Sequence, residues 1–245
     1  MFIPKSKPHE KTHEDMKLKD SFTLLSWNVH KENLELDFQR RLDKFLNRYK
    51  IDFLLFQEYK MDKSNLILPK EYNIATAPNI ETKSNLYGLL TASKSTIEKK
   101  LINLSSSKEF YLATKKANLA THHFFADGEE LVVVNLHAIN FVGAKNFIKE
   151  LEKLQEFLSL HSCPVIVSGD FNNWSKKRFD ALMELERSLG FRQAAVENSK
   201  YIKHFFNKPI DHLFYKGIEL VEARAFDTKK MSDHNPIFAT FKQLK

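Results

Sequence analysis

Short apolar runs alternate with amphipathic segments along most of the chain, from Ser21 onward. The apolar runs are rich in β-branched and aromatic residues, which is typical of buried β-strands. They occupy residues 22–25, 53–56, 86–90, 131–136, 165–167 and 210–215. Residues 99–104 and 118–125, followed by a turn at Asp127-Gly128, are typical of antiparallel strands joined by hairpins.

Three of the segments between these runs carry apolar residues at helical spacing. The residues are Phe38, Leu42, Phe45, Leu46 and Tyr49 in the first, Phe147, Ile148, Leu151, Leu154 and Leu158 in the second, and Phe179, Leu182, Met183 and Leu189 in the third. Each pattern predicts a helix that buries one stripe. Strands and helices together predict an α/β fold in which two mixed β-sheets pack face to face and helices lie outside them.

The chain has 245 residues, of which 42% are hydrophobic and 28% charged, so it can bury one sizeable core. We expect a single domain over residues 21–245. Residues 1–20 mix both charges with prolines and lack the apolar centre of a secretory signal, so a flexible leader is expected there. No stretch of the chain approaches the roughly 18 apolar residues of a membrane span, and no stable membrane insertion is expected.

The few glycines and the single cysteine exclude several kinds of site. No two of the six glycines are spaced to form a phosphate-cradling GxGxxG or GxxxxGK[ST] loop, which argues against nucleotide-binding folds that use one. Cys163 has no second cysteine to pair with, so an internal disulfide framework and a zinc site of paired CxxC ligands are both excluded. The lone cysteine favours a reducing, cytoplasmic location.

The charge balance favours a polyanionic partner. Lys and Arg total 38 against 31 Asp and Glu, which gives a net charge of +7. Nucleic acid and an anionic membrane surface both fit such a charge, although a basic surface also serves solubility. The sequence indicates no protein partner.

Four of the strand-like runs end in the same way, with an acid, an amide or a histidine directly after the apolar segment. The residues at these ends are Asn28, Glu58, His137, Asp170 and Asn172. Ligand sites in α/β sheets form where strand ends converge, so these side chains are expected to meet in space. Taken singly, each has a structural alternative: an amide can satisfy a turn, an acid can cap a helix, and a histidine can be structural.

Two later segments fit the same set. Asp211 lies inside an apolar run, and the segment Ser232-Asp233-His234-Asn235-Pro236 comes just before the last strand-like run. Because burying an unpaired carboxylate is costly, Asp211 needs a partner, for which a histidine is the natural candidate.

These residue types suit the hydrolysis of phosphate esters. Carboxylate and amide oxygens without cysteine favour Mg²⁺ or Mn²⁺ over a closed zinc site. Hydrolysis of a phosphate ester needs a cation, a base that orients or deprotonates water, and donors for the charge that develops on the phosphoryl oxygens. The set contains each of these parts.

Six short motifs carry a family resemblance, and they span nearly all of residues 21–241. They are SWNVH (26–30), LLFQE (54–58), VVNLHAIN (133–140), VSGDFNNW (167–174), PIDHLF (209–214) and SDHNP (232–236). Through them the sequence resembles the endonuclease/exonuclease/phosphatase superfamily, which includes the DNase I-like and exonuclease III-like hydrolases. GDFN and SDHNP are the most specific of the six. The resemblance implies a four-layer α/β sandwich with a divalent-metal site at one end.

The resemblance also implies which residues hold the metal. Glu58 matches the principal Mg²⁺ ligand, with Mn²⁺ as a possible substitute. Asn28 lies beside it in this scheme, and Asp233 is a further or alternative ligand.

The remaining matched residues are implied to be catalytic. Asp170 looks like the residue that orients or deprotonates the attacking water, and Asn172 like a donor to the phosphoryl oxygen. His234 would contact the scissile phosphate while Asp211 holds its tautomer and charge. His137 stands where DNase I-like members carry a second active-site histidine and exonuclease III-like members carry a tyrosine.

The expected function is therefore a divalent-metal-dependent hydrolase of phosphodiester bonds, in first place a nuclease acting on DNA or RNA. The candidate substrate contacts are Lys115 and Lys116, the run Lys176-Lys177-Arg178, and the aromatic pair Phe205-Phe206, which could face a base or a lipid. The alternative is a phosphatase or phospholipase-type phosphodiesterase acting on a phosphoinositide, a sphingolipid or a small phosphorylated substrate. A non-catalytic binding module would need a broken site, and none of the matched positions is substituted.

Overall fold

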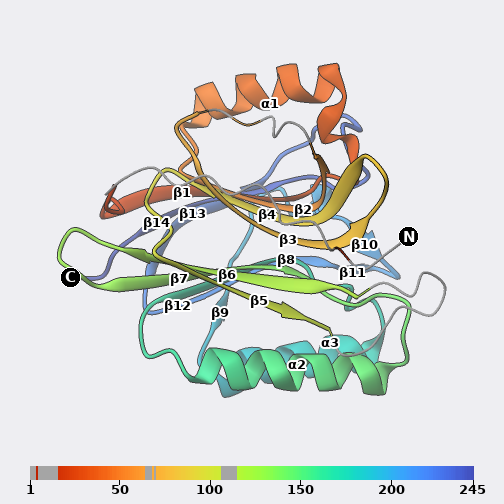
Figure 1. Cartoon of the computed structure of the whole chain (residues 1–245). Coiled ribbons are helices and arrows are strands. Elements are labelled where there is room, and N and C mark those ends of the chain that lie inside the picture. Colours follow the sequence, from red (N-terminus) through yellow and green to blue (C-terminus); the bar gives the residue numbers. More distant parts are fainter. Residues whose placement is uncertain (1–3, 5–15, 64–67, 69, 106–114) are drawn as a thin grey trace.

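Two six-stranded mixed β-sheets lie face to face in the computed structural model, which describes residue 4 and residues 16–63, 68, 70–105 and 115–245. Helices cover the outer face of each sheet, so that the chain forms four layers (Figure 1). This is the α/β arrangement expected from the alternation of apolar runs and amphipathic segments.

The first sheet has the strand order β13-β14-β1-β2-β4-β3. Its strands are β1 (Ser21–Asn28), β2 (Phe53–Asp62), β3 (Asn73–Glu81), β4 (Asn85–Ser93), β13 (Glu219–Ala225) and β14 (Ile237–Lys242). Strands β1 and β2 are parallel, with Asn28 opposite Gln57. β1 therefore ends beside the middle of β2, which continues to Asp62 instead of ending at Glu58 as its apolar run indicated.

The second sheet has the strand order β5-β6-β7-β8-β12-β9. Its strands are β5 (Lys99–Leu104), β6 (Ala117–Phe124), β7 (Glu130–His137), β8 (Val165–Asp170), β9 (Arg192–Gln193) and β12 (Asp211–Lys216). Strands β7 and β8 are parallel, with His137 opposite Asp170, and the antiparallel strand β12 begins with Asp211 opposite the same aspartate. Pairing alone thus brings three of the polar residues together.

Three α-helices supply the outer layers. Helix α1 (Leu36–Tyr49) covers the first sheet, and α2 (Ala144–Ser159) and α3 (Lys176–Ser188) cover the second (Figure 1). These are the three helices that the apolar spacing predicts. Two 3₁₀ turns, η1 (Glu32–Leu34) and η2 (Ser199–Tyr201), lie in connections, and a small hairpin is formed by β10 (His204–Phe205) and β11 (Lys208–Pro209). No helix among the described residues is both long enough and apolar enough to cross a membrane.

The buried side chains form separate clusters between these layers. Phe22, Phe53, Val133 and Ile166 belong to the cluster between the two sheets. A second cluster lies between α1 and the first sheet, and a third between α2, α3 and the second sheet. Because apolar residues fill all three gaps, the two sheets form a rigid frame whose strand ends can hold polar groups in place.

The last residues of the expected N-terminal leader belong to the folded domain. Most of residues 1–15 lie outside the described chain. Leu18, however, is buried in the cluster between the sheets, and its backbone N–H donates to the carbonyl of Phe124. A single apolar side chain among lysines gives no periodic signal, so the sequence assigned this residue to the leader although it packs in the core.

Candidate active site

The polar residues at the strand ends line one cavity of about 670 Å³. It lies where β1, β7 and β8 end and where β2 bulges, and it receives side chains from both sheets. Those of the sequence-predicted residues that line it are Asn28, Glu58, Lys116, His137, Asp170, Asn172, Phe205, Phe206, Asp233 and His234. Asp211 is buried behind His234, and Lys115 does not line the cavity.

Gly169 sets the backbone that delivers Asp170. Its φ is +147°, and a Cβ at this position would lie 1.9 Å from the carbonyl oxygen of Leu136 on the neighbouring strand. Only glycine allows this close approach of β8 to β7. The Asp170 side chain accepts hydrogen bonds from the Asn28 amide at 3.1 Å and from the backbone N–H of Asn172 at 3.0 Å.

Glu58 sits in a β-bulge. The pairing of β2 with β4 shifts register between Phe56 and Tyr59, and Glu58 has a φ of +51°. A bulge turns an inserted side chain out of the regular alternation. The preceding Gln57 is buried and donates to the Asn135 side chain at 2.7 Å across the sheets.

Two lysines and a histidine surround the Glu58 carboxylate. Lys31 lies 3.1 Å from it, His137 3.8 Å and Lys116 3.9 Å. Burial alone would raise the pKa of Glu58, but the charges of His137, Lys116 and Lys31 outweigh it and lower the pKa to about 2. Glu58 is therefore an anion at neutral pH.

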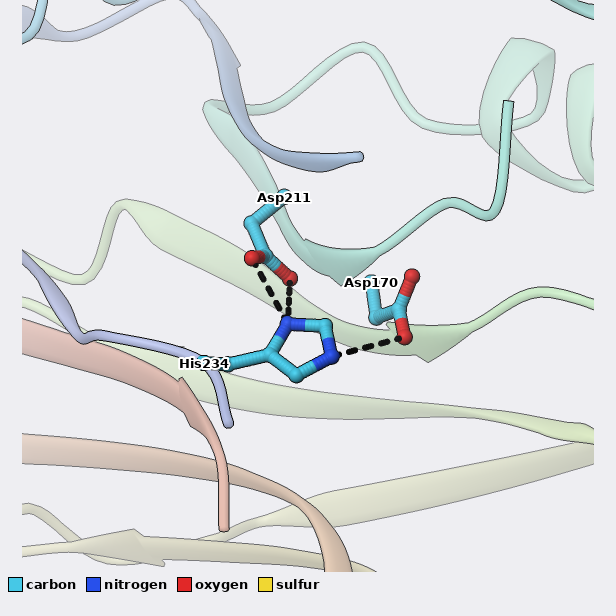
Figure 2. A group of neighbouring side chains, drawn as sticks. All are labelled: Asp170, Asp211 and His234. Atoms are coloured by element: carbon cyan, nitrogen blue, oxygen red, sulfur yellow. Dashed lines mark hydrogen bonds and ion pairs between the residues drawn. The ribbon is translucent and has the colours of Figure 1, made fainter. Parts of the chain in front are cut away.

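His234 is held between two carboxylates from different strands, as Figure 2 shows. Its Nδ1 lies 2.8 Å from one oxygen of Asp211 and 3.1 Å from the other, and its Nε2 lies 3.9 Å from Asp170. The backbone carbonyl of His234 accepts a hydrogen bond from the Trp27 indole at 2.9 Å, which fixes the loop that carries the histidine. Asp211 therefore has the histidine partner that its place in an apolar run requires.

This pairing sets the charge of His234. Burial alone would lower the pKa of His234, but the negative charge of Asp211, its hydrogen bond and the charge of Asp170 raise the pKa to about 9. The ring is thus an imidazolium at neutral pH. Burial raises the pKa of Asp170, against the opposing effect of the two neighbouring histidines.

The pKa of His137 is shifted in the opposite direction from that of His234. Its Nε2 lies 3.0 Å from Nζ of Lys116 and 3.6 Å from Asp170. Burial and the charge of Lys116 lower the pKa of His137 to about 4, and Asp170 and Glu58 offset this only in part. At neutral pH the ring is uncharged, so it accepts a hydrogen bond from the lysine rather than forming an ion pair.

The two amides complete the floor of the cavity. Asn28 donates to Asp170 through Nδ2, while its Oδ1 accepts from the backbone N–H of His30 at 3.1 Å. Asn172 has a φ of +47°, and its amide donates to the carbonyl of Ala138 at 3.1 Å. Both side chains are buried and fixed before any ligand binds.

The donors suit a hard divalent cation at Glu58. Asp170, Asp211 and His234 also offer ligand atoms within 4.8 Å of one another. Both oxygens of Asp211 already contact Nδ1 of His234, however, so that trio fits a hydrogen-bonded relay better than a metal site. Glu58 is an ionised carboxylate that opens onto the cavity, and oxygen ligands of this kind are those that Mg²⁺ and Mn²⁺ prefer.

Two lysines of the site carried no sequence signal beyond their charge. Lys31 contacts Glu58, and Lys203 contacts the half-exposed Asp233 carboxylate at 2.9 Å. Lys31 is three residues after Asn28, a separation that marks it as near the site only once Asn28 is assigned. Lys203 lies between the 3₁₀ turn η2 and the hairpin, and the path of this connection places it at the cavity. No hydrophobic periodicity in the sequence predicts that path.

Arg178 corrects an expectation from the sequence. The run that it closes is a candidate set of phosphate contacts, yet its side chain is 1% exposed. Because it lies on the inner face of α3, it points toward the loops that follow β7 and β8. Its guanidinium donates to the backbone carbonyls of Ile139, Asn140, Val142 and Asn172, at 2.5–3.2 Å.

Comparisons with known proteins agree with this fold. The chain is 31% identical over 223 residues to a UPF0294 protein of Vibrio parahaemolyticus, covering 89% of this chain and 76% of that one. The human Nocturnin catalytic domain, solved with a bound sulfate anion, has a TM-score of 0.65 and 15% identity, covering 93% and 96% of the two chains. A mannosyl-6-phosphatase of Bacteroides thetaiotaomicron has a TM-score of 0.63 and 16% identity, covering 90% and 99%.

A match to a protein-family model identifies the family of the chain. The model described as the endonuclease/exonuclease/phosphatase family matches residues 25–234, a span that holds every residue of the candidate site described above. The chain belongs to the endonuclease/exonuclease/phosphatase family, whose members hydrolyse phosphodiesters and other phosphate esters.

Proposed function

We propose that this protein is a Mg²⁺-dependent phosphodiesterase, with Mn²⁺ as a possible substitute, and that it cleaves DNA or RNA. The observation that carries the proposal is His234, an imidazolium fixed by Asp211, which faces the same cavity as the ionised Glu58. Phosphoryl transfer needs positive charge on the phosphoryl oxygens together with a group that handles the proton of water.

Each residue then has a role that its contacts support. Glu58 holds the cation, with Asn28 beside it and Asp233 as a further or alternative ligand at the cavity mouth. The cation, when bound, neutralises charge on the phosphate and on the leaving oxygen. Divalent metals are in general use in the family.

The remaining groups orient water and phosphate. Asp170 accepts the proton of the attacking water or orients it, and a pKa raised by burial makes its carboxylate a better proton acceptor. His234 donates from Nε2 to a phosphoryl oxygen, and Asn172 donates through its amide. Lys116 and the neutral His137 form a second pair of groups on the opposite side of Asp170.

Charge supports a nucleic acid as the substrate. Lys31, Lys116 and Lys203 line the cavity, and the whole chain has a net charge of +7. Lysines along a site favour a strand that carries a charge on every phosphate. A cytoplasmic location, indicated by the single Cys163, belongs to the same proposal.

A specific observation keeps one alternative open. Phe205 and Phe206 are 48% and 76% exposed at the mouth of the cavity, and a lipid head-group substrate would present acyl chains there. The alternative is thus a phosphatase or phospholipase-type phosphodiesterase acting on a phosphoinositide, a sphingolipid or a small phosphorylated substrate.

One screen separates these functions. Purified protein is incubated with Mg²⁺ or Mn²⁺ and single-stranded DNA, duplex DNA, RNA, phosphoinositides, sphingomyelin or mannose 6-phosphate, with Asp170→Asn as the blank. We expect metal-dependent cleavage of at least one nucleic acid, absent from the blank and lost on chelation. Turnover of the lipids or the sugar phosphate alone would overturn the nuclease proposal.

A further inference from the structure

An aromatic wall stands at the mouth of the active-site cavity, formed by Trp174, Phe205 and Phe206. The ring centroids of Phe205 and Phe206 lie 4.8 Å apart, and those of Trp174 lie 6.1 Å from Phe205 and 6.3 Å from Phe206. All three side chains line the cavity that holds Asp170 and His234. The three rings therefore pack edge to face or tilted against one another along the cavity wall, and Phe206 stays 76% exposed at the mouth.

The tryptophan is fixed before any ligand arrives. Its Nε1 donates to the Asn140 side chain at 3.0 Å, and the guanidinium of the buried Arg178 lies 4.7 Å from its ring. Arg178 also contacts Phe147 of α2 at 4.7 Å, which anchors the arrangement in the core. A ring held in this way loses little conformational entropy when another ring stacks on it.

Phe206 occupies a backbone conformation that its side chain does not favour. It follows β10 in a two-residue hairpin turn, where its φ is +46° and that of Asn207 is +59°. Turns with two positive φ values prefer glycine, asparagine or aspartate, and a bulky residue there is strained. Residues strained in this way cluster at active sites and ligand-binding sites.

The rest of the cavity suits a polar, planar ligand. Its wall from β3 and β4 carries Tyr87, whose hydroxyl can hydrogen bond to the edge of a base, and Asn79. The Nδ2 of Asn79 donates to the carbonyl of Lys115 at 2.6 Å, so its amide oxygen is the group that can accept from a base. Lys203 lies between the hairpin and Asp233, where it can contact a phosphate adjacent to the one that is cleaved. An acyl chain has no polar group with which to bind the side chains of Asn79 and Tyr87 or the ammonium of Lys203.

We propose that the aromatic wall is a subsite for an unpaired nucleobase next to the scissile phosphate, which makes a single strand or an unpaired end the preferred substrate. The inference rests on the proposed nuclease function and narrows it. A base inside a duplex has both faces stacked on its neighbours, so it reaches the rings only when it is unpaired. Base–aromatic stacking also tolerates any sequence, because every base has a π-face.

The test separates the contribution of the bases to binding from that of the phosphates. Binding is measured by fluorescence anisotropy in the Asp170→Asn background, using a labelled single-stranded oligonucleotide, a strand of equal length built from abasic residues, and a blunt duplex. The abasic strand has the same phosphates and no rings. We expect the base-bearing single strand to bind about tenfold more tightly than the abasic strand, as expected for one stacked base.

Phe206→Asn supplies the matched variant, because asparagine accepts the left-handed turn. We expect this variant to melt no lower than the parent and to lose the tenfold preference, while binding of the abasic strand is unchanged. Leu244→Asn, which removes a 56% exposed apolar side chain far along the chain from the hairpin, should retain the preference. Trp174→Leu is a second test of the preference for the base-bearing strand, and it leaves the hairpin turn unchanged.

The outcomes are distinct. Equal binding of base-bearing and abasic strands by the parent overturns the inference, as does Phe206-dependent binding to vesicles of phosphatidylglycerol and phosphatidylcholine without any preference for bases. If base-dependent binding is found but neither strand is cleaved by the protein with an intact Asp170, the subsite stands and the proposed nuclease function fails.

Discussion

The ammonium group of Lys116 lies 3.0 Å from Nε2 of His137 and 3.9 Å from the carboxylate of Glu58. One cation therefore touches both a neutral imidazole and the proposed metal ligand. The lysine directly precedes β6, whose first residue Ala117 is opposite His137 at the end of the pairing with β7. The two sheets, and not a local motif, bring the three side chains together.

Removal of this cation has a measurable effect on the histidine. In Lys116→Met we expect the pKa of His137 to rise from about 4, because the repulsion between the ammonium and a protonated ring is gone. Turnover should fall about 10- to 100-fold, since a donor to the phosphate is lost with it. Titration of the His137 ring by NMR and steady-state kinetics measure the two effects. Lys99→Met, an exposed lysine of β5, is the control, and an unchanged His137 pKa would refute the proposed coupling.

Glu58→Gln tests the metal ligand. The parent should be stabilised by Mg²⁺, by about 2.7 kcal/mol when the ion is at 100 times its dissociation constant. The variant should lose both this stabilisation and most turnover, because an amide oxygen carries no charge for a hard cation. Thermal melts with Mg²⁺ and with a chelator give the first quantity. Glu32→Gln, an acid in the nearby 3₁₀ turn, should behave like the parent; a Mg²⁺-stabilised Glu58→Gln protein would place the ion elsewhere.

Much of this site could be predicted from sequence because strand ends are local features. Asn28 and Asp170 each end a strand, and parallel pairing places such ends at one edge. Glu58 also follows an apolar run, but β2 continues through it to Asp62, and a bulge turns it toward the site. The fold follows in the same way from apolar alternation and helical stripes. The partner of Asp211 was also deducible, since a carboxylate in an apolar run demands compensation.

The parts that sequence did not supply depend on tertiary contacts. Arg178 resembles its lysine neighbours in the sequence, but it is on the buried face of α3, and only the loops packed there reveal its partners. Lys31 and Lys203 reach the cavity from irregular connections, where no period constrains the direction of a side chain. Leu18 is buried because the chain before β1 runs alongside Phe124 and Phe125.

Asp211→Asn should shift the pH dependence of the reaction. His234 keeps its proton up to a pKa of about 9 chiefly because Asp211 offsets the effect of burial. Without that charge the pKa of His234 should fall toward or below its ordinary value, so the imidazolium is lost near neutral pH. We expect the alkaline limb of the pH–rate profile to move to lower pH, with a loss of more than tenfold at pH 8 and a smaller loss at pH 6. A profile of unchanged shape would show that Asp211 does not set the charge of His234.

The same pair links stability to pH. Because the folded pKa of His234 lies above the unfolded value, the folded state binds more protons between about pH 6.5 and pH 9. The stabilisation is complete below pH 6.5 and is lost as the pH rises toward 9. We expect a contribution of about 3 kcal/mol to disappear across this window, as measured by urea unfolding, and to be absent in His234→Asn.

Arg178→Met should affect both the fold and the reaction. The guanidinium donates to carbonyls in the loop after β7 and in the loop after β8, which includes that of Asn172. Methionine fills similar space and supplies no donors, so the carbonyls lose their partners at a cost of about 3 kcal/mol in unfolding free energy. Urea unfolding measures this cost, with Lys177→Met on the exposed face of α3 as the control.

Arg178→Lys separates positioning from stability. A lysine keeps the charge but cannot donate in a planar fork to several carbonyls at once. At a temperature where this variant is fully folded, we expect kcat to fall more than KM changes, because Asn172 and Trp174 are then held less rigidly against the substrate. If kcat and KM both stayed at the parental values while stability fell, Arg178 would support the fold alone and the two loops would hold the site without it.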